Sequence, residues 1–285
     1  MNRTRICDLD VNGFFLGDCA NGALYARIHY TADPAKDSEW AAHERARVPE
    51  REWLREMEMA EDVYDGEPVF ADYRDAWHCL AQSEPLPLVK GSHYIGGWDC
   101  GQTITPSFVL IQITPRPWQM HALLEVVSPG AEPMEKFAPR VQIELQRRLP
   151  GRWDEVEHWG DQTVIQRNGA NGETAQQAAG RHGFRIRPAS NEWVGRYSAV
   201  TWLLMDSIDE HTPRFLIDGR HCPVLREGFQ GAYKFEESAR GEAVGPGRIL
   251  IQRPLKNSYS HVHDALQYAA CRVKKLFRGG RFEAR

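Results

Sequence analysis

Residues 107–127, which read SFVLIQITPRPWQMHALLEVV, set the fold class that the sequence predicts. Two apolar runs, Ser107–Thr114 and Trp118–Val127, are separated by Pro115-Arg116-Pro117. Proline interrupts regular backbone pairing, so this tripeptide marks a turn and the whole stretch is typical of a β-hairpin. A third short apolar run, His93–Trp98, lies just upstream. We therefore expect three consecutive antiparallel strands at the start of a sheet.

Downstream of this hairpin, segments with helical spacing alternate with short apolar runs. Met134, Phe137, Val141 and Leu145 recur at the spacing of one helix face. The same reasoning predicts helices over residues 134–149, 173–182, 192–205 and 260–275, and strands over residues 155–159, 184–187 and 214–217. Three antiparallel strands followed by this alternation predict an α/β fold with a mixed sheet flanked by helices.

Residues 1–90 have a different pattern, and we expect them to form an N-terminal extension. Val11–Gly17 and Ala23–Tyr30 are typical of two short strands around a turn. Residues 49–62 predict a charged helix with a narrow apolar stripe. Glu84–Leu88 contains two prolines, so it predicts an extended linker.

The composition excludes several broad classes of protein. With 42% hydrophobic residues among 285, the chain can form a substantial core. No apolar run reaches the ~18 residues of a membrane span, and the first residues lack the apolar stretch of a signal peptide. The 6 cysteines are far apart and form no C-x-x-C pair. This disfavours a disulfide scaffold or a zinc ribbon and suits a reducing compartment.

The formal charge of −4 conceals an asymmetry along the chain. Residues 33–75 carry 14 acidic and 6 basic side chains, whereas residues 248–285 carry 9 basic and 2 acidic ones. We therefore expect a domain over residues 91–285 that ends in a basic tail. Such a tail indicates a phosphate-rich partner, although a solvated surface segment has the same composition.

Three carboxylates lie at the ends of predicted elements. Asp99 and Asp161 each close a strand, and Asp264 lies in the first turn of the last helix. Such ends are where open α/β sheets build their sites. Carboxylates brought together repel one another unless a hard cation such as Mg²⁺ lies between them, and two such ions about 4 Å apart can cleave phosphodiesters. Each acid alone is more typical of a turn or a cap, so the residues themselves leave both interpretations open.

Other motifs give weaker or negative signals. The sequence has no G-x-x-x-x-G-K-[ST] and no G-x-S-x-G, so a Walker-type ATP site and a hydrolase nucleophile elbow lack support. His261 and His263 are a weak candidate for zinc, because positions i and i+2 of a helix do not face each other. Gly96 and Gly97 lack the pattern of a phosphate loop.

The residues around the three acids resemble the acidic motifs of a known family, the nuclease domain of tailed-phage terminase large subunits. Gly97–Pro106 (GWDCGQTITP) is similar to the first motif, and Trp159–Asp161 (WGD) to the second. Lys256–Tyr268 (KNSYSHVHDALQY) is similar to the third and is the most specific of them. The resemblance extends over about residues 92–275, and residues 20–75 resemble the segment that joins ATPase to nuclease.

The resemblance implies an RNase H-like fold and a metal-dependent DNA endonuclease. Such domains cut concatemeric viral DNA during packaging, with two Mg²⁺ or Mn²⁺ ions and little sequence specificity. The implied metal ligands are Asp99, Asp161 and Asp264, and Lys256 is a further implied catalytic residue. The residues expected to contact DNA are Arg196, Arg253 and Lys256.

The resemblance also implies partners, and its departures keep alternatives open. Expected partners are double-stranded DNA, a packaging ATPase outside these residues, the portal and the small terminase subunit, in the host cytoplasm and without a membrane. Gln162 replaces a proline of many relatives, and His263 replaces a second acid, so His263 is a candidate additional ligand. The alternatives are another RNase H-like nuclease (a junction resolvase, transposase or ribonuclease) and a catalytically degenerate DNA-binding packaging module.

Overall fold

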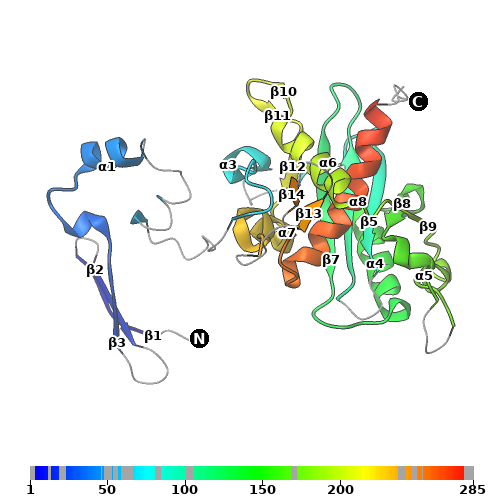
Figure 1. Ribbon diagram of the computed structural model, residues 1–285, viewed down its shortest axis with the longest axis horizontal. Coiled ribbons are helices and arrows are strands. Elements are labelled where there is room, and N and C mark those ends of the chain that lie inside the picture. Colours follow the sequence, from blue (N-terminus) through cyan, green and yellow to red (C-terminus); the bar gives the residue numbers. More distant parts are fainter. Residues whose placement is uncertain are drawn as a thin grey trace. The chain divides into compact units, whose positions relative to one another are not determined.

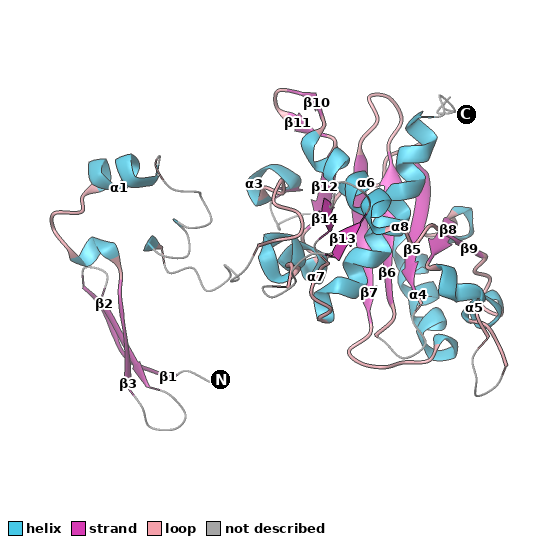
Figure 2. Ribbon diagram, in the orientation of Figure 1, coloured by secondary structure: helices cyan, strands magenta, loops and turns pink. Residues whose placement is uncertain are grey.

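The computed structural model divides the chain into two compact units, Met1–Asp65 and Gly66–Arg285. Figures 1 and 2 show the elements of each unit. The residues described are 4–11, 14–18, 24–45, 47, 53, 57–58, 67–80, 85–100, 105–167, 172–236, 242–244, 249–251 and 253–278. The helix predicted over residues 49–62 lies almost wholly outside them.

The first unit contains a three-stranded antiparallel sheet and a short helix. Its elements are β1 (Thr4–Val11), β2 (Phe14–Asp18), β3 (Leu24–Ile28) and α1 (Ser38–Arg45). The strands pair in the order β1-β2-β3. The two predicted strands correspond to β2 and β3, whereas β1 was not predicted from the sequence.

The second unit is built on a seven-stranded mixed sheet with the order β4-β12-β7-β6-β5-β8-β9. These strands are β4 (Cys79–Leu80), β5 (His93–Asp99), β6 (Ser107–Ile113), β7 (Met120–Val127), β8 (Glu157–Gly160), β9 (Ile186–Pro188) and β12 (Phe215–Asp218). Strands β5, β6 and β7 are antiparallel neighbours, so the predicted hairpin is confirmed. Parallel pairs extend the sheet on both sides. Two small hairpins pair β10 (Ser207–Asp209) with β11 (Thr212–Pro213), and β13 (Glu242–Val244) with β14 (Ile249–Ile251).

Helices cover both faces of this sheet (Figure 2). They are α3 (Asp75–His78), α4 (Met134–Arg148), α5 (Ala175–Gly180), α6 (Trp193–Met205), α7 (Pro223–Glu227) and α8 (Ser258–Arg278). One core cluster joins α4 and α5 to sheet residues such as Trp98, and another joins α6, α7 and α8 to residues such as Ile95 and Val109. The predicted mixed sheet flanked by helices is therefore confirmed. Among the described helices, none combines the length and the apolar character needed to cross a membrane.

Two adjacent glycines allow unusually close packing on the two faces of β5. At Gly97 a Cβ atom would lie 2.0 Å from the carbonyl oxygen of Ala265 in α8. At Gly96 a Cβ atom would lie 2.5 Å from the ring of His158 and 2.6 Å from Phe108. These glycines therefore allow α8 and the core on the opposite face to pack directly against β5.

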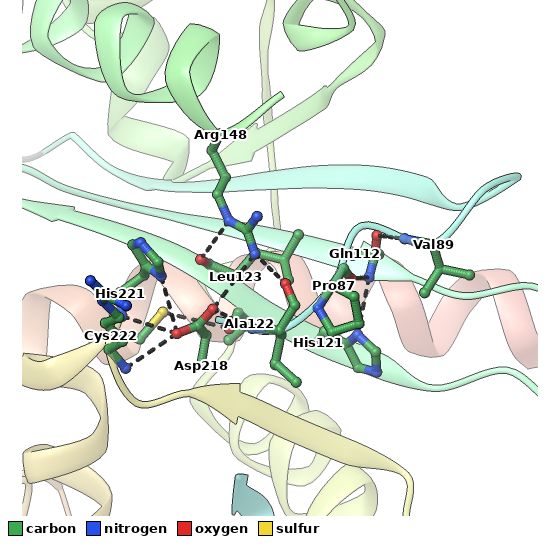
Figure 3. A network of polar contacts seen from close by, with 12 residues as sticks. Pro87, Val89, Gln112, His121, Ala122, Leu123, Arg148, Asp218, His221 and Cys222 are labelled. Carbon is green, nitrogen blue, oxygen red and sulfur yellow. Dashed lines mark hydrogen bonds and ion pairs between the residues drawn. The ribbon is translucent and has the colours of Figure 1, made fainter. Parts of the chain in front are cut away.

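A buried polar network fixes the extended segment before β5 (Figure 3). The Leu86 N–H donates to Asp218 Oδ2 at 2.8 Å, and Arg148 donates to the Leu86 carbonyl oxygen at 2.5 Å. Gln112 donates to the Pro87 carbonyl oxygen at 3.1 Å and accepts from the backbone N–H of Val89. The segment is extended, as its prolines predict, and it is tied firmly to the sheet.

These contacts explain why the second unit begins before residue 90. Val69, Phe70 and Leu86 are each less than 5% exposed and belong to its core clusters. The division between compact units accordingly falls at Asp65, whereas the composition of the sequence suggested residue 90.

Candidate functional site

The ends of two parallel strands place Asp99 beside Asp161. Trp98 in β5 pairs in register with Gly160 in β8, so the residue after each of them continues at the same edge of the sheet. The Asp161 N–H donates to the Trp98 carbonyl oxygen at 3.3 Å, which fixes the start of the loop after β8. The two predicted strand-end acids are therefore neighbours.

Helix α8 brings the third acid to the same place. The His261 Nδ1 atom lies 2.8 Å from Asp99 Oδ2, and Asp264 follows His261 by one helical turn on the same face. The close approach of α8 to β5 at Gly97 makes this contact geometrically possible. The structure thus joins the first and third predicted motifs through a histidine.

Burial and mutual repulsion shape the electrostatics of these acids. Asp99 is 6% exposed and Asp264 is 4% exposed. Burial raises the pKa of Asp99, and the charge of Asp264 raises it further against the opposing effect of His261. Burial likewise raises the pKa of Tyr268, and the charges of Asp161, Asp264 and Asp99 all add to that shift. The three carboxylates therefore act on one small region of the protein.

Arg196 is a buried partner of Asp264. Its guanidinium donates to Asp264 Oδ1 at 2.9 Å, and its side chain is only 11% exposed. The guanidinium lies 5.8 Å from the ring centroid of Trp193 and 4.9 Å from that of Tyr268. Burial lowers the pKa of Arg196, but the charge of Asp264, the nearby Tyr268 and Tyr233 and the hydrogen bond to Asp264 together outweigh this effect, so the pKa of Arg196 is raised. Arg196 is therefore a largely buried partner of Asp264 and is not a surface cation.

Lys256 contacts the other oxygen of the same carboxylate. Its Nζ atom donates to Asp264 Oδ2 at 2.5 Å, while 65% of its side chain is exposed. Arg253, three residues earlier, is also exposed. Of the three cations predicted to contact DNA, Lys256 and Arg253 are accessible, and Arg196 is largely covered.

Asp161 also serves as a cap, as the alternative interpretation of a strand-end acid predicted. Its Oδ1 atom accepts the Thr163 N–H at 3.0 Å at the start of the helical turn Gln162–Ile165. Asp161 is only partly buried, unlike Asp99 and Asp264. Asn191 lies beside this turn, with Oδ1 at 3.4 Å from the Gln162 nitrogen and 3.5 Å from the Tyr268 hydroxyl.

His263 lies in the core, away from the acids. Its ring is fully buried and stacks on Tyr233, with centroids 4.5 Å apart. A Cβ atom at Gly228 would lie 2.1 Å from His263 Nε2, so the ring packs directly on that backbone. Burial lowers the pKa of His263 to about 3. The idea that His263 completes a ligand shell is therefore wrong for this arrangement.

The donor chemistry at Asp99 and Asp264 fits a hard divalent cation. Both supply carboxylate oxygen, and their repulsion is the condition that a cation relieves. Within the part of the chain that the structure describes, however, no cluster of three or more His, Cys, Asp or Glu side chains is arranged to hold an ion. His261, Arg196 and Lys256 compensate the acids instead.

Two residues of this site, His261 and Tyr268, are not among the metal-binding, catalytic or DNA-contacting residues that the sequence predicted. His261 was predicted only as a weak zinc candidate, and Tyr268 was given no role of its own. His261, Asp264 and Tyr268 follow one another at i, i+3 and i+7, which places them on one helix face. This spacing is the signal in the sequence that joins the three residues on one face of the helix.

Comparison with solved structures identifies the fold. The P22 large terminase nuclease domain matches with a TM-score of 0.53 at 13% sequence identity, over 73% of this chain and 92% of that domain. The large terminase of a thermophilic bacteriophage matches with a TM-score of 0.52 at 11% identity, over 87% of this chain. This chain covers 55% of that second protein, or about half its length. No family model and no curated protein sequence matches the chain.

The second unit thus has the class of fold that its predicted strands and helices indicated, an α/β mixed sheet flanked by helices. More particularly, the chain has the fold of the phage large terminase nuclease domain. The expected fold class and the structural resemblance are both confirmed.

Proposed function

We propose that this protein is a metal-dependent DNA endonuclease that cuts concatemeric viral DNA during genome packaging. One observation carries the proposal: two buried carboxylates, Asp99 and Asp264, lie at the edge of a terminase-like sheet with side-chain partners only, among the described residues. The adjacent Asp161 adds a third carboxylate to this edge. Such repelling charges favour a cation that can bind phosphate oxygen.

The proposed roles follow from the contacts of each residue. Asp99, Asp161 and Asp264 would hold Mg²⁺ or Mn²⁺, which in pairs activate a water molecule and stabilise the leaving oxygen of a phosphodiester. His261 orients Asp99, and Arg196 orients Asp264. Lys256 is exposed and contacts Asp264, and Arg253 is exposed three residues earlier; both would contact the phosphate backbone. Contacts of this kind carry no direct sequence information, so we expect little sequence specificity.

The partners follow from the proposed role. The large terminase of the thermophilic bacteriophage extends well beyond the matched region, which supports a packaging motor outside these residues. We propose that the nuclease works on double-stranded DNA with a packaging ATPase, the portal and the small terminase subunit, in the host cytoplasm.

Cleavage of supercoiled plasmid tests this function. We expect the native chain to nick and then linearise plasmid with Mn²⁺ or Mg²⁺, and Asp161→Ala to lose this activity. Asp154→Ala is the matched control, since Asp154 is an exposed acid on the turn before β8. Absence of cleavage with both metals, in a chain folded by circular dichroism, would contradict the proposal.

The same assay separates the alternatives. A strong preference for branched DNA or for an RNA–DNA hybrid would indicate another RNase H-like nuclease. DNA binding without metal binding or cleavage would indicate a packaging module with a degenerate site. In every DNA-binding case the affinity should fall steeply with salt, because phosphate contacts release counterions.

A further inference from the structure

The two cationic partners of Asp264 differ sharply in accessibility. Arg196 binds Oδ1 with a side chain that is 11% exposed, whereas Lys256 binds Oδ2 with a side chain that is 65% exposed. The same buried carboxylate therefore has one covered partner and one solvent-facing partner.

The surroundings of each cation determine how easily it can leave. Trp193 and Tyr268 both contact the Arg196 guanidinium, so its departure would break aromatic contacts as well as the ion pair. Lys256 precedes α8 and carries a compact, well-hydrated ammonium group on a flexible stem. Its ammonium can exchange Asp264 for water without disturbing the core.

We propose that Lys256 is an exchangeable counter-ion, which neutralises Asp264 in the metal-free site and must be displaced from Oδ2 when a divalent ion binds. This inference rests on the proposed function, because it assigns the metal to the same acids. Arg196 stays on Oδ1 throughout and presents the carboxylate in a fixed orientation. The displaced ammonium group then becomes available to a phosphate, so one residue serves the metal-free and the loaded states in turn.

Direct measurement of metal affinity tests the exchange. We would titrate Mn²⁺ into the full chain by isothermal calorimetry, without DNA, for the native protein, Lys256→Met and Lys136→Met. Lys256→Met should bind Mn²⁺ about fivefold more tightly, the effect of removing one exposed competing ion pair. Lys136→Met makes the same change of net charge at an exposed position on α4, so its affinity should match that of the native chain.

Each outcome gives a definite answer. Equal or weaker binding by Lys256→Met would overturn the exchange, while Mn²⁺ binding by the native chain would leave the proposed nuclease standing. Absence of binding by both proteins would overturn the exchange and the metal site together. Binding by Lys256→Met alone would also overturn the exchange, because Lys256 would then block the site and would not give way to the metal.

A stability measurement distinguishes the two cations without any metal. Arg196→Met should lower the melting temperature of the metal-free protein clearly more than Lys256→Met does, because only Arg196 is packed between aromatic rings. Equal losses in the two variants would contradict the division into a fixed and an exchangeable partner. Arg196→Lys should recover part of the loss, since it restores the charge without the planar group.

Discussion

Asp99 and Asp218 occupy equivalent positions in the sheet and differ in what binds them. Each is the last residue of its strand, β5 and β12, and each is almost completely buried. Strand β12 pairs parallel to β7. Strands β5 and β7 each pair antiparallel to β6, so β5 runs in the same direction as β7. The carboxyl ends of β5 and β12 therefore lie at the same edge of the sheet. The pair therefore compares two buried carboxylates in one framework.

Backbone donors hold Asp218, and the His221 ring at 3.1 Å and Arg148 at 3.6 Å are its additional side-chain partners. It accepts the N–H groups of Leu86 at 2.8 Å, His221 at 3.1 Å and Arg220 at 3.2 Å. Among the described residues, Asp99 has only the side chain of His261 as a hydrogen-bond partner. Backbone donors leave only when the structure opens, whereas a side chain can give way to a ligand. A buried carboxylate bound by backbone is therefore structural, and one bound by side chains is available for chemistry.

The largest expected effect is on catalysis at Asp99. Asp99→Asn should reduce metal-dependent plasmid cleavage by roughly a thousandfold, because metal ions supply several kcal/mol of transition-state stabilisation. Its free energy of unfolding should stay the same or rise, since burial already disfavours the charged carboxylate. Cleavage rates and urea unfolding of the same preparations check both statements. Retained cleavage would remove Asp99 from the site.

The same substitution at Asp218 should have the opposite outcome. Asp218→Asn should lower the free energy of unfolding by about 3 kcal/mol, because it replaces an acceptor and leaves buried donors and Arg148 poorly paired. Cleavage per folded molecule should persist. Urea unfolding beside the cleavage assay measures this, and an unchanged stability would show that the backbone contacts contribute little.

Gly97→Ala tests how α8 carries Asp264 to the strand end. The added methyl group would clash with the Ala265 carbonyl oxygen, so α8 must shift. We expect the free energy of unfolding to fall by an amount near the upper end of about 1–3 kcal/mol. Cleavage should fall as well, because Asp264 adjoins Ala265. Gly130→Ala is the control, as nothing lies within 4 Å of a Cβ atom there. Equal stability of the two variants would contradict the close packing of α8 on β5.

The smallest effect concerns Glu125, whose carboxylate accepts the backbone N–H groups of Val224 and Leu225. Burial nevertheless raises the pKa of Glu125 from 4.5 to about 7, so the folded state holds a proton that the unfolded state releases. Its contribution to stability is therefore present below pH 4.5 and is lost as the pH rises through 7. We expect a loss of about 2 kcal/mol between about pH 5 and pH 7 in the native chain, absent from Glu125→Gln.

Unfolding titrations at several pH values, compared between the native chain and Glu125→Gln, isolate this effect. The same slope in both proteins would assign it to other groups. Because Glu125 combines backbone donors with a raised pKa, it also shows that burial can outweigh backbone hydrogen bonds.

Local pattern predicted the main strands and helices of the second unit and the three acids at element ends. Periodicity within about ten residues decides such elements, and the hairpin over residues 107–127 is the clearest case. The side chains that contact these acids could not be predicted from local pattern, because tertiary structure brings them from distant parts of the sequence. His261 is 162 positions from Asp99, and Arg196 is 68 positions from Asp264. The difference between Asp99 and Asp218 is only partly local: Arg220 and His221 donate to Asp218 from the turn that follows it, whereas Leu86 reaches it from 132 positions away.

Mn²⁺ binding to Asp99→Asn and Asp218→Asn tests the central claim most directly. Electron paramagnetic resonance of free Mn²⁺ during titration reports binding independently of cleavage. We predict that Asp99→Asn binds Mn²⁺ at least about tenfold more weakly than the native chain, and that folded Asp218→Asn keeps the native affinity. Native affinity in Asp99→Asn, or its loss in folded Asp218→Asn, would contradict the claim that the carboxylates bound by side chains form the functional site.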